Sequence, residues 1–363
     1  MNYHKYQTIQ LNGEYFDKEK LKIFITKSSQ LPDWKKDIFD FILEWLDENS
    51  TIQAQTSGTT GTPKTIFLEK DKMVNSAIHT GSFFNLKENE KALLCLSPNY
   101  IAGKMMIVRA FVLGLNLVIV EPTGNPLRNT DFGSIDFAAM VPLQVFNSFH
   151  NKGELNQLRK IKKTIIGGGV VSKTLHGFLQ KEENNFFATY GMTETITHIA
   201  IKKLNGTDAN ENYQTLTNVG ITTDSRECLV IDAPDVASER VITNDLVKII
   251  SPTQFQWLGR FDNVINSGGV KIIPEEVERT LSQFLNQRFF VSSWPDEKLG
   301  NRLILLIEDS DFSENEKENL NTFMKNCLPK FSIPREIYFL EKFEETNSGK
   351  IQREKTKQLI SRM

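Results

Sequence analysis

The sequence contains little cysteine and little histidine. Its three cysteines, Cys95, Cys228 and Cys327, are widely separated and form no CxxC pair, so the sequence predicts neither a zinc ribbon nor a disulfide framework. The five histidines include no HxxxH or HExxH pair, which argues against a protein-bound transition metal. Cysteine usage of this kind is typical of a reducing compartment, and we expect a cytoplasmic protein.

The sequence predicts neither an export signal nor a membrane span. The N-terminus is polar and charged and offers no apolar core for a signal peptide. The longest apolar stretch, residues 101–120, contains Lys104, Arg109 and Asn116, so we interpret it as a helix followed by a buried strand.

No charge of either sign is in excess. The chain has 43 Lys and Arg against 45 Asp and Glu, a formal net charge of −2, which gives no general attraction for nucleic acid or for an anionic membrane. A length of 363 residues with 39% hydrophobic content is long enough for about two domains with a sizeable core. The 25 phenylalanines outnumber the tryptophans and tyrosines, which favours buried aromatic packing.

The first half of the chain predicts an α/β fold. Residues 91–191 alternate short apolar runs with segments of helical period, which is typical of crossover units around a parallel sheet. Continuous apolar strands such as residues 117–121 indicate burial on both faces of that sheet. We expect strands at 92–97, 117–121, 136–141, 163–167 and 185–190, and helices at 103–113, 142–150 and 172–180.

The second half predicts a small β region and then a compact α+β domain. The runs 198–202, 227–232, 246–250 and 256–258 are short and interrupted by polar residues, as antiparallel strands are. Pro274 and the glutamates after it predict a helix start. Beyond it we expect strands at 289–293, 302–307 and 336–340 and a helix at 313–327.

The strongest chemical motif is a run of small and hydroxylated residues that ends on a lysine. Glycines there can expose backbone N–H groups to an anion, and the hydroxyls and the lysine add further donors, so the run predicts a phosphate-binding loop. It is not a Walker A loop, which requires GxxxxGK[ST]. The run consists of Thr56, Ser57, Gly58, Thr59, Thr60, Gly61, Thr62, Pro63 and Lys64.

Together with five later motifs, this loop resembles the adenylate-forming superfamily, which includes acyl- and aryl-CoA synthetases, peptide-synthetase adenylation domains and firefly luciferase. The motifs occur in the family's order through nearly the whole chain. Two positions depart from it: Asn244 stands where the TGD motif has Gly, and Glu344 stands where the last motif has an upstream Pro. The later motifs are 166–169 (IGGG), 188–195 (ATYGMTET), 243–245 (TND), 259–265 (GRFDNVI) with the glycine loop 267–278, and 348–353 (SGKIQR).

The resemblance implies ATP as substrate with Mg2+, and coenzyme A as co-substrate. An aromatic ring can cover the purine, a carboxylate can accept from the ribose hydroxyls, and a hard oxygen ligand suits Mg2+. Any one of these residues alone would more often have a structural role. ATP or AMP would be bound by Thr56, Ser57, Gly58, Thr59, Thr60, Gly61, Lys64, Gly168, Gly169, Tyr190, Gly191, Thr193, Asp245 and Arg260, and the catalytic residues would be Lys350, Thr193, Glu194 and Lys64, with Glu194 as the metal ligand.

The resemblance also implies two domains, of which the second is mobile. A large AMP-binding domain, residues 1–261, would be followed by a small lid domain, residues 262–363, with the hinge at Asp262. Rotation about the hinge would withdraw Lys350 from the active site and bring in the loop of Gly268 and Gly269. The pantetheine of CoA would approach along this loop. The chain is short for the superfamily, because only 55 residues precede the phosphate loop.

The acid would be bound by Tyr100, Arg109, Gly191 and Met192. The pattern of an aromatic residue, a glycine and a helix with Arg109, followed by the VPLQ segment 141–144, resembles the o-succinylbenzoate-CoA ligases of menaquinone synthesis. Their substrate has two carboxylates, so that one can be adenylated while Arg109 holds the other. The alternatives are another aryl or acyl acid with CoA or a carrier protein as acceptor, and a non-catalytic nucleotide-binding relative; Arg109 would then be a helix-surface residue. The oligomeric state is not indicated.

Overall fold

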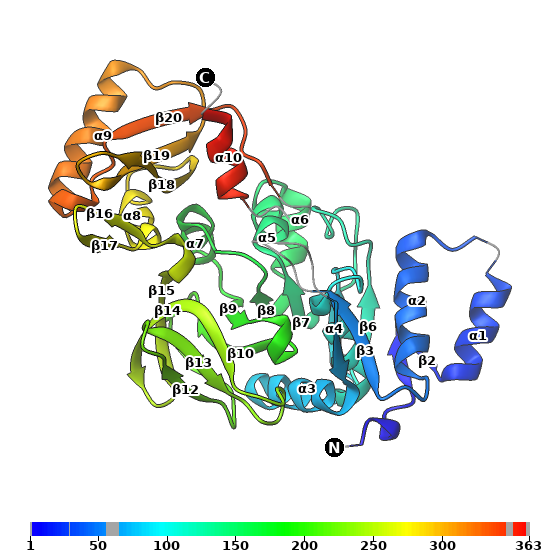
Figure 1. Cartoon of the computed structure of the whole chain (residues 1–363). Coiled ribbons are helices and arrows are strands. Elements are labelled where there is room, and N and C mark those ends of the chain that lie inside the picture. The colour runs from blue at the N-terminus through cyan, green and yellow to red at the C-terminus, as the bar shows by residue number, and fades with distance from the viewer. Residues whose placement is uncertain (1, 29, 56–64, 346–350, 361–363) are drawn as a thin grey trace. The chain divides into compact units, whose positions relative to one another are not determined.

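A computed structural model describes residues 2–28, 30–55, 65–345 and 351–360 (Figure 1). The chain divides into two compact units, of which the first comprises residues 1–221, 231–241 and 251–254 and the second comprises 222–230, 242–250 and 255–363. The expected hinge at Asp262 therefore lies within the second unit and stays a prediction. No helix among the described residues has both the length and the apolar character to cross a membrane.

The first unit is built on the predicted parallel sheet. From β9 through β8, β7, β5 and β6 to β1 the neighbouring strands are parallel, and β10, β11 and β2 add antiparallel pairs at the two sides. This arrangement confirms the α/β fold class. The strands are β1 (Ile9–Leu11), β2 (Glu14–Phe16), β5 (Lys91–Leu94), β6 (Asn116–Ile119), β7 (Ile135–Met140), β8 (Ile161–Ile166), β9 (Asn185–Gly191), β10 (His198–Lys203) and β11 (Tyr213–Thr215).

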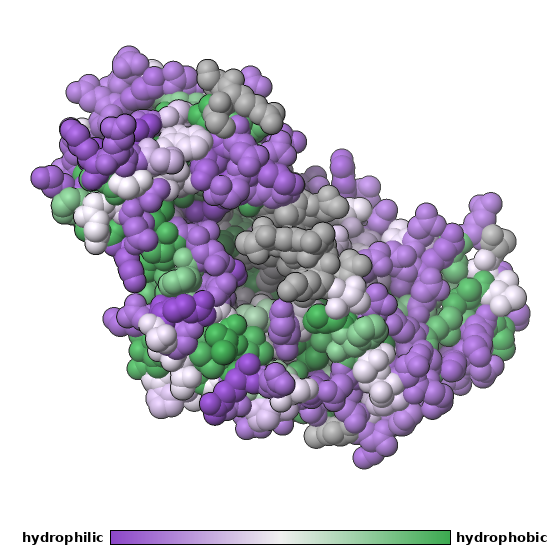
Figure 2. Space-filling model, viewed as in Figure 1, coloured by the Kyte–Doolittle hydropathy of each residue, from purple (hydrophilic) through white to green (hydrophobic). Residues whose placement is uncertain are grey.

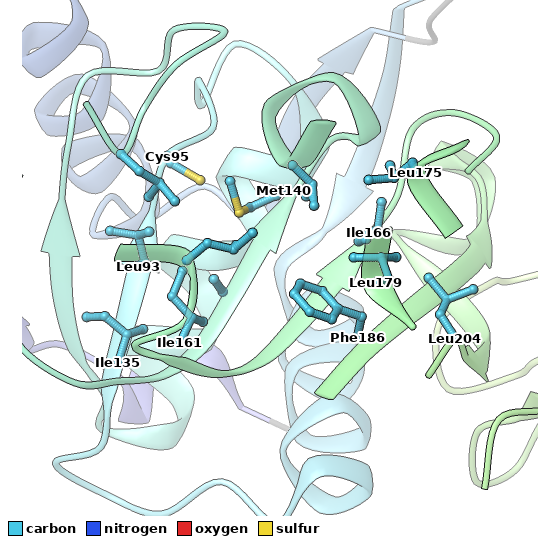
Figure 3. Packing of buried hydrophobic residues seen from close by; sticks show 14 of the residues in the cluster. Leu93, Cys95, Ile135, Met140, Ile161, Ile166, Leu175, Leu179, Phe186 and Leu204 are labelled. Carbon is cyan, nitrogen blue, oxygen red and sulfur yellow. The ribbon is translucent and has the colours of Figure 1, made fainter. Parts of the chain in front are cut away.

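Helices cover the sheet, three of them at the predicted places. They are α3 (Lys70–Phe84), α4 (Ile101–Leu113), α5 (Pro142–Phe149), α6 (Lys152–Leu158) and α7 (Lys173–Leu179), of which α3 and α6 were not predicted. Helix α5 begins with Pro in its first turn, and α4 ends at Gly114, whose φ of +66° is left-handed. Leu175 and Leu179 of α7 belong to the same buried cluster as Ile166 of β8 and Phe186 of β9 (Figure 3).

The N-terminal segment of the first unit was largely missed from the sequence. It contains η1 (Tyr3–Lys5), α1 (Lys18–Lys27), α2 (Asp33–Trp45) and a hairpin of β3 (Thr51–Gln55) and β4 (Thr65–Glu69). The short strands β1 and β2 extend the main sheet. On the face seen in Figure 2, hydrophilic residues predominate on the surface of this segment.

Lys70 is buried and binds the C-terminal end of α2. Its side chain has no exposed surface, and Nζ donates to the carbonyls of Glu44 (2.8 Å), Trp45 (3.0 Å) and Asp47 (3.1 Å). Nζ also lies 2.7 Å from Asp47 Oδ1. The last carbonyls of a helix have no partner within it, and a cation there also complements the helix dipole. Lys70 therefore joins α2 to the start of α3.

The second unit contains four neighbouring strands and then the predicted α+β region. In order they are β12 (Gly220–Thr223), β13 (Cys228–Asp232), β14 (Val241–Ser251) and β15 (Gln254–Arg260). After them, the sheet β18-β19-β20 is buried on one face by α8 and α9 and on the other by α10. The remaining elements are η3 (Phe261–Asn263), β16 (Ile265–Ser267), β17 (Val270–Ile272), α8 (Pro274–Leu281), β18 (Arg288–Asp296), β19 (Gly300–Glu308), α9 (Glu314–Cys327), η4 (Lys330–Ser332), β20 (Glu336–Leu340) and α10 (Arg353–Ile360).

We predict that Lys70→Met destabilises the first unit. The substitution leaves three carbonyls and a carboxylate without their buried donor, which costs about 2–4 kcal/mol and lowers the midpoint of thermal unfolding by about 5–10 °C. Differential scanning calorimetry measures this shift. The matched control is Lys36→Met on α2, because Lys36 pairs with Asp33 on the exposed surface and its loss should move the midpoint by less than about 2 °C. Equal shifts for the two variants would contradict the role given to Lys70.

Candidate active site

Several predicted site residues lie at the carboxyl ends of the parallel strands. Gly168 and Gly169 follow β8, and Tyr190 and Gly191 end β9. Open parallel sheets bind ligands at this edge. The loops there are tied together by Gln144, which donates to the carbonyls of Cys95 and Thr123 at 2.9 Å each and accepts from the N–H of Val141 at 3.1 Å. In this structure Gln144 therefore has a structural role.

Close backbone packing requires glycine at the end of β9. A Cβ on Gly191 would lie 2.2 Å from the carbonyl oxygen of Thr197, so no other residue fits without moving the chain. Gly168 has a φ of +78° in the turn after β8. Both turns are thus fixed by backbone geometry at the edge where the nucleotide is expected.

The turn after Gly191 is held in one conformation by its own side chains. Thr195 Oγ1 accepts from the N–H of Met192 at 3.2 Å and donates to the carbonyl oxygen of Thr197 at 2.8 Å. Ile196 has a φ of +63°, a strained value for a β-branched residue, and strain of this kind is often found at functional sites. Thr193 is buried within η2 (Thr193–Thr195), and its neighbour Glu194 is exposed.

The exposed carboxylate of Glu194 fits the role of a magnesium ligand. Among the described residues no group of three or more His, Cys, Asp or Glu could hold a metal by itself. Mg2+ in nucleotide sites commonly takes one or two carboxylates together with substrate phosphates and water, so a single acid is a sufficient protein ligand.

Tyr190 has an aromatic neighbour that the sequence analysis missed. The ring of Tyr213 on β11 lies 5.8 Å from that of Tyr190, and Lys202 Nζ lies 5.2 Å from the Tyr213 centroid. Burial, and secondarily the charge of Glu211, raises the pKa of Tyr213 to about 12. Tyr213 therefore supports the ring that we expect against adenine. No motif in the sequence marks it, since it follows a loop of unrelated composition.

Arg109 is the most unusual residue of the first unit. It lies on α4 with 1% of its surface exposed, and its Nε and Nη2 have no hydrogen-bond partner among the residues that the structure describes. Nη1 reaches only the sulfur of Met106, at 3.5 Å. Burial lowers its pKa to about 9, and none of the described residues places a carboxylate beside it to offset that effect. Within the described part of the chain, the guanidinium is thus a buried cation whose Nε and Nη2 have no acceptor.

Lys104, the other cation on α4, has a different environment. Its Nζ lies 3.4 Å from Glu44 of α2 and 4.4 Å from the centroid of the Phe41 ring. Lys104 does not face solvent, since only 12% of its side chain is exposed. Tyr100 precedes α4 and is 53% exposed.

His198 connects Arg109 to the turn after β9. It is the register partner of Gly191, and the charge of Arg109 contributes, after burial, to lowering its pKa well below the usual value. Its Nε2 lies 3.2 Å from Thr80 Oγ1, which donates to the carbonyl of Ser76, so the imidazole is the donor in that contact. His198 is therefore a neutral, buried group beside the residues expected to bind the acid, and the sequence analysis did not assign it a role.

In the second unit, Asp245 and Arg260 lie together. Asp245 on β14 accepts from Trp257 Nε1 at 3.2 Å, and Arg260 Nη1 lies 3.7 Å from the same carboxylate oxygen. Arg260 Nη2 donates to Asp262 at 3.0 Å. Trp257 was not predicted as a site residue, although it stands only three positions before Arg260.

The predicted CoA loop and the last motif are also in the second unit. Gly268 and Gly269 form the turn between β16 and β17, with φ of +58° and +81°. Arg353, from the last motif, makes a bidentate pair with Glu278 of α8 at 2.7 and 2.8 Å. The phosphate loop with Thr56, Ser57, Gly58, Thr59, Thr60, Gly61 and Lys64, and the expected catalytic Lys350, lie outside the described residues.

Comparisons with known proteins agree with these features. The family described as AMP-binding enzyme matches residues 22–239. A 2-succinylbenzoate--CoA ligase from Geobacillus is 25% identical over 86% of this chain and 70% of its own. An acyl-CoA synthetase (AMP-forming)/AMP-acid ligase II-like protein from Dyadobacter fermentans is 35% identical, with a TM-score of 0.64, over 94% of this chain and 98% of its own. An O-succinylbenzoate coenzyme A synthetase from Bacillus subtilis, solved with ATP and magnesium, has a TM-score of 0.69 at 18% identity over 95% of this chain and 83% of its own, and shares the fold.

We predict that His198 makes the protein sensitive to acid. Because its pKa is lower in the folded than in the unfolded chain, the unfolded chain takes up the proton first as the pH falls below about 6.5, and stability falls with it by at most about 1.4 kcal/mol per pH unit. His198→Gln keeps a donor for Thr80 and should flatten the dependence of the unfolding midpoint on pH between about 7 and 5. His4→Gln, at an exposed position, is the control and should retain the original slope. Parallel profiles for the wild type and His198→Gln would contradict this assignment.

Proposed function

Since the chain belongs to the AMP-binding enzyme family, we propose that it is an AMP-forming acid–CoA ligase whose acid is 2-succinylbenzoate. The observation that carries the choice of acid is the Arg109 guanidinium, which is buried and whose Nε and Nη2 have no acceptor among the described residues. We place the reaction in the cytoplasm, as a step of menaquinone biosynthesis.

The first half-reaction forms an acyl-adenylate. A carboxylate oxygen of the acid attacks the α-phosphorus of ATP, and pyrophosphate leaves. In this proposal Tyr190 covers the adenine, Asp245 accepts from the ribose hydroxyls, and Lys64 and Lys350 hold the charge that redistributes over the phosphates. Mg2+ bound at Glu194 would neutralise part of that charge. Catalysis is therefore positional and electrostatic, without a covalent enzyme intermediate.

The second half-reaction forms the thioester. The sulfur of CoA attacks the acyl carbonyl carbon of the adenylate, and AMP leaves. Gly268 and Gly269 suit the approach of the pantetheine arm because the turn has no side chains; a Cβ on Gly269 would meet none of the described residues within 4 Å, whereas one on Gly268 would lie 3.2 Å from Leu299. Rotation near Asp262 would replace one set of residues by the other between the two steps.

The acid is selected by charge. Burying a guanidinium without a counter-ion is costly, and a ligand carboxylate at Nε and Nη2 would offset that cost with two charge-assisted hydrogen bonds. A monocarboxylic acid cannot do this while presenting its only carboxylate to ATP. Arg109 therefore favours an acid with two carboxylates, and 2-succinylbenzoate has them.

Two assays together distinguish the proposed function from a carrier-protein acceptor and from a non-catalytic nucleotide-binding relative. Acid-dependent exchange of pyrophosphate into ATP, across a panel of 2-succinylbenzoate, benzoate and a short aliphatic diacid, tests adenylation, and thioester formation with CoA tests the acceptor. Exchange without transfer to CoA would indicate a carrier-protein acceptor. Absence of exchange with every acid would indicate a non-catalytic nucleotide-binding relative.

We predict that Arg109→Ala and Arg109→Met raise KM for 2-succinylbenzoate about 100-fold and leave KM for ATP within about twofold, because only the second carboxylate loses its partner. Arg109→Met should also raise the unfolding free energy by about 1–4 kcal/mol, since it fills the site without a charge. Steady-state kinetics and calorimetry measure the two effects.

Lys104→Met is the matched control for the charge of α4. Because Lys104 already pairs with Glu44, its loss should leave KM for the acid within about twofold. Equal increases of KM for the acid and for ATP in Arg109→Ala would contradict the proposed role of Arg109.

A further inference from the structure

A polar network in the second unit surrounds the proposed hinge residue. The carboxylate of Asp262 accepts from Asn244 Nδ2, at 3.2 Å to one oxygen and 3.3 Å to the other. It also accepts from Arg260 Nη2 at 3.0 Å. Asn244 lies on β14 and Asp262 in η3, so these bonds join the backbone before the hinge to the hinge itself.

Arg226 fixes the orientation of the Asn244 amide. Its Nη1 donates to Asn244 Oδ1 at 2.8 Å, which turns the amide nitrogen toward Asp262. Arg226 is itself held by Asp224, at 2.8 Å from Nε, and by the carbonyl of Thr243, at 3.1 Å from Nη2. Its guanidinium carbon lies 5.1 Å from the centroid of the Phe261 ring, the residue next to Asp262.

Only an amide at position 244 satisfies both neighbours. Its oxygen accepts from a guanidinium while its nitrogen donates to a carboxylate. Glycine, which the TGD motif has at this position, can do neither through a side chain, and an aspartate would repel Asp262. The departure from the motif at Asn244 is therefore matched by specific contacts.

We propose that Asn244, oriented by Arg226, is a positioning residue. Its hydrogen bonds to Asp262 hold the hinge in one backbone conformation. Hinge motions change φ and ψ at very few residues, so the Asp262 carboxylate moves when the backbone turns and its bonds to Asn244 must break. Charge-assisted hydrogen bonds are strong enough to shift a two-state equilibrium several-fold. The inference rests on the proposed function, because a hinge equilibrium matters only to an enzyme that alternates between two half-reactions.

The first test measures the hinge directly. Hydrogen exchange by mass spectrometry should show the amides of residues 261–264 exchanging several-fold faster in Asn244→Ala than in the wild type. Asn244→Asp keeps the shape of the side chain but replaces the donor nitrogen by an acceptor oxygen. In this variant the same amides should exchange at least as fast as in Asn244→Ala. Asn321→Ala, an exposed asparagine on α9, is the control and should leave these amides unchanged. Unchanged exchange in both Asn244 variants would overturn the proposal.

The second test measures the two half-reactions separately. Pyrophosphate exchange reports adenylation, and release of AMP from preformed acyl-adenylate and CoA reports thioester formation. In Asn244→Ala one of these two rates should rise and the other should fall, each about 3–10-fold. KM for ATP should stay within about twofold of the wild-type value. A fall in both rates together would indicate a structural or nucleotide-binding role and overturn the proposal. If the wild type adenylates no acid, the proposed function fails while the exchange experiment still decides whether Asn244 holds Asp262.

Discussion

One physical constraint organises the candidate acid site of the first unit: α4 keeps the Arg109 guanidinium away from water, and none of the residues that the structure describes pairs with its Nε or Nη2. Such a charge is tolerated in a folded protein only where packing supplies enough free energy to offset its lost hydration. Helix α4 supplies that packing through its other buried residues, which include Met105, Ile107 and Phe111. Burial, and secondarily the charge of Arg109, lowers the pKa of His198 well below its usual value, so this imidazole does not add a second positive charge near neutral pH. A ligand with a second carboxylate would form an ion pair with the Arg109 guanidinium.

Lys70 shows the alternative solution to the same problem. It is as deeply buried as Arg109, but three carbonyls and one carboxylate occupy its donors. A satisfied cation of this kind stabilises a join between elements and has no capacity left for a ligand. The contrast shows that burial alone does not mark a binding residue; the unused donors do.

The sequence predicted the elements whose period is strong and missed those that depend on distant partners. Strands β7 to β9 and helices α4, α5 and α9 lie within a few residues of their expected bounds, because long buried runs and clear helix starts are local signals. Helices α1 and α2 carry mixed charge, and the end of α2 is fixed by Lys70, a contact that a local pattern does not reveal. Among the site residues, motifs pointed to Tyr190 and Asp245, but their neighbours Tyr213 and Trp257 were invisible because only the fold brings them there.

The residues that hold the site together follow a common physical rule. Gln144 supports the loops at the sheet edge, Arg353 fastens the last motif to Glu278, and Arg226 orients Asn244. In each case a side chain with several donors or acceptors bridges two segments that are distant in the sequence. Motif residues can then occupy loops, where ligands have access, while their positions are set by side chains outside the motifs or at their ends. A substitution in a supporting residue should therefore alter the chemistry through geometry even though it touches no substrate.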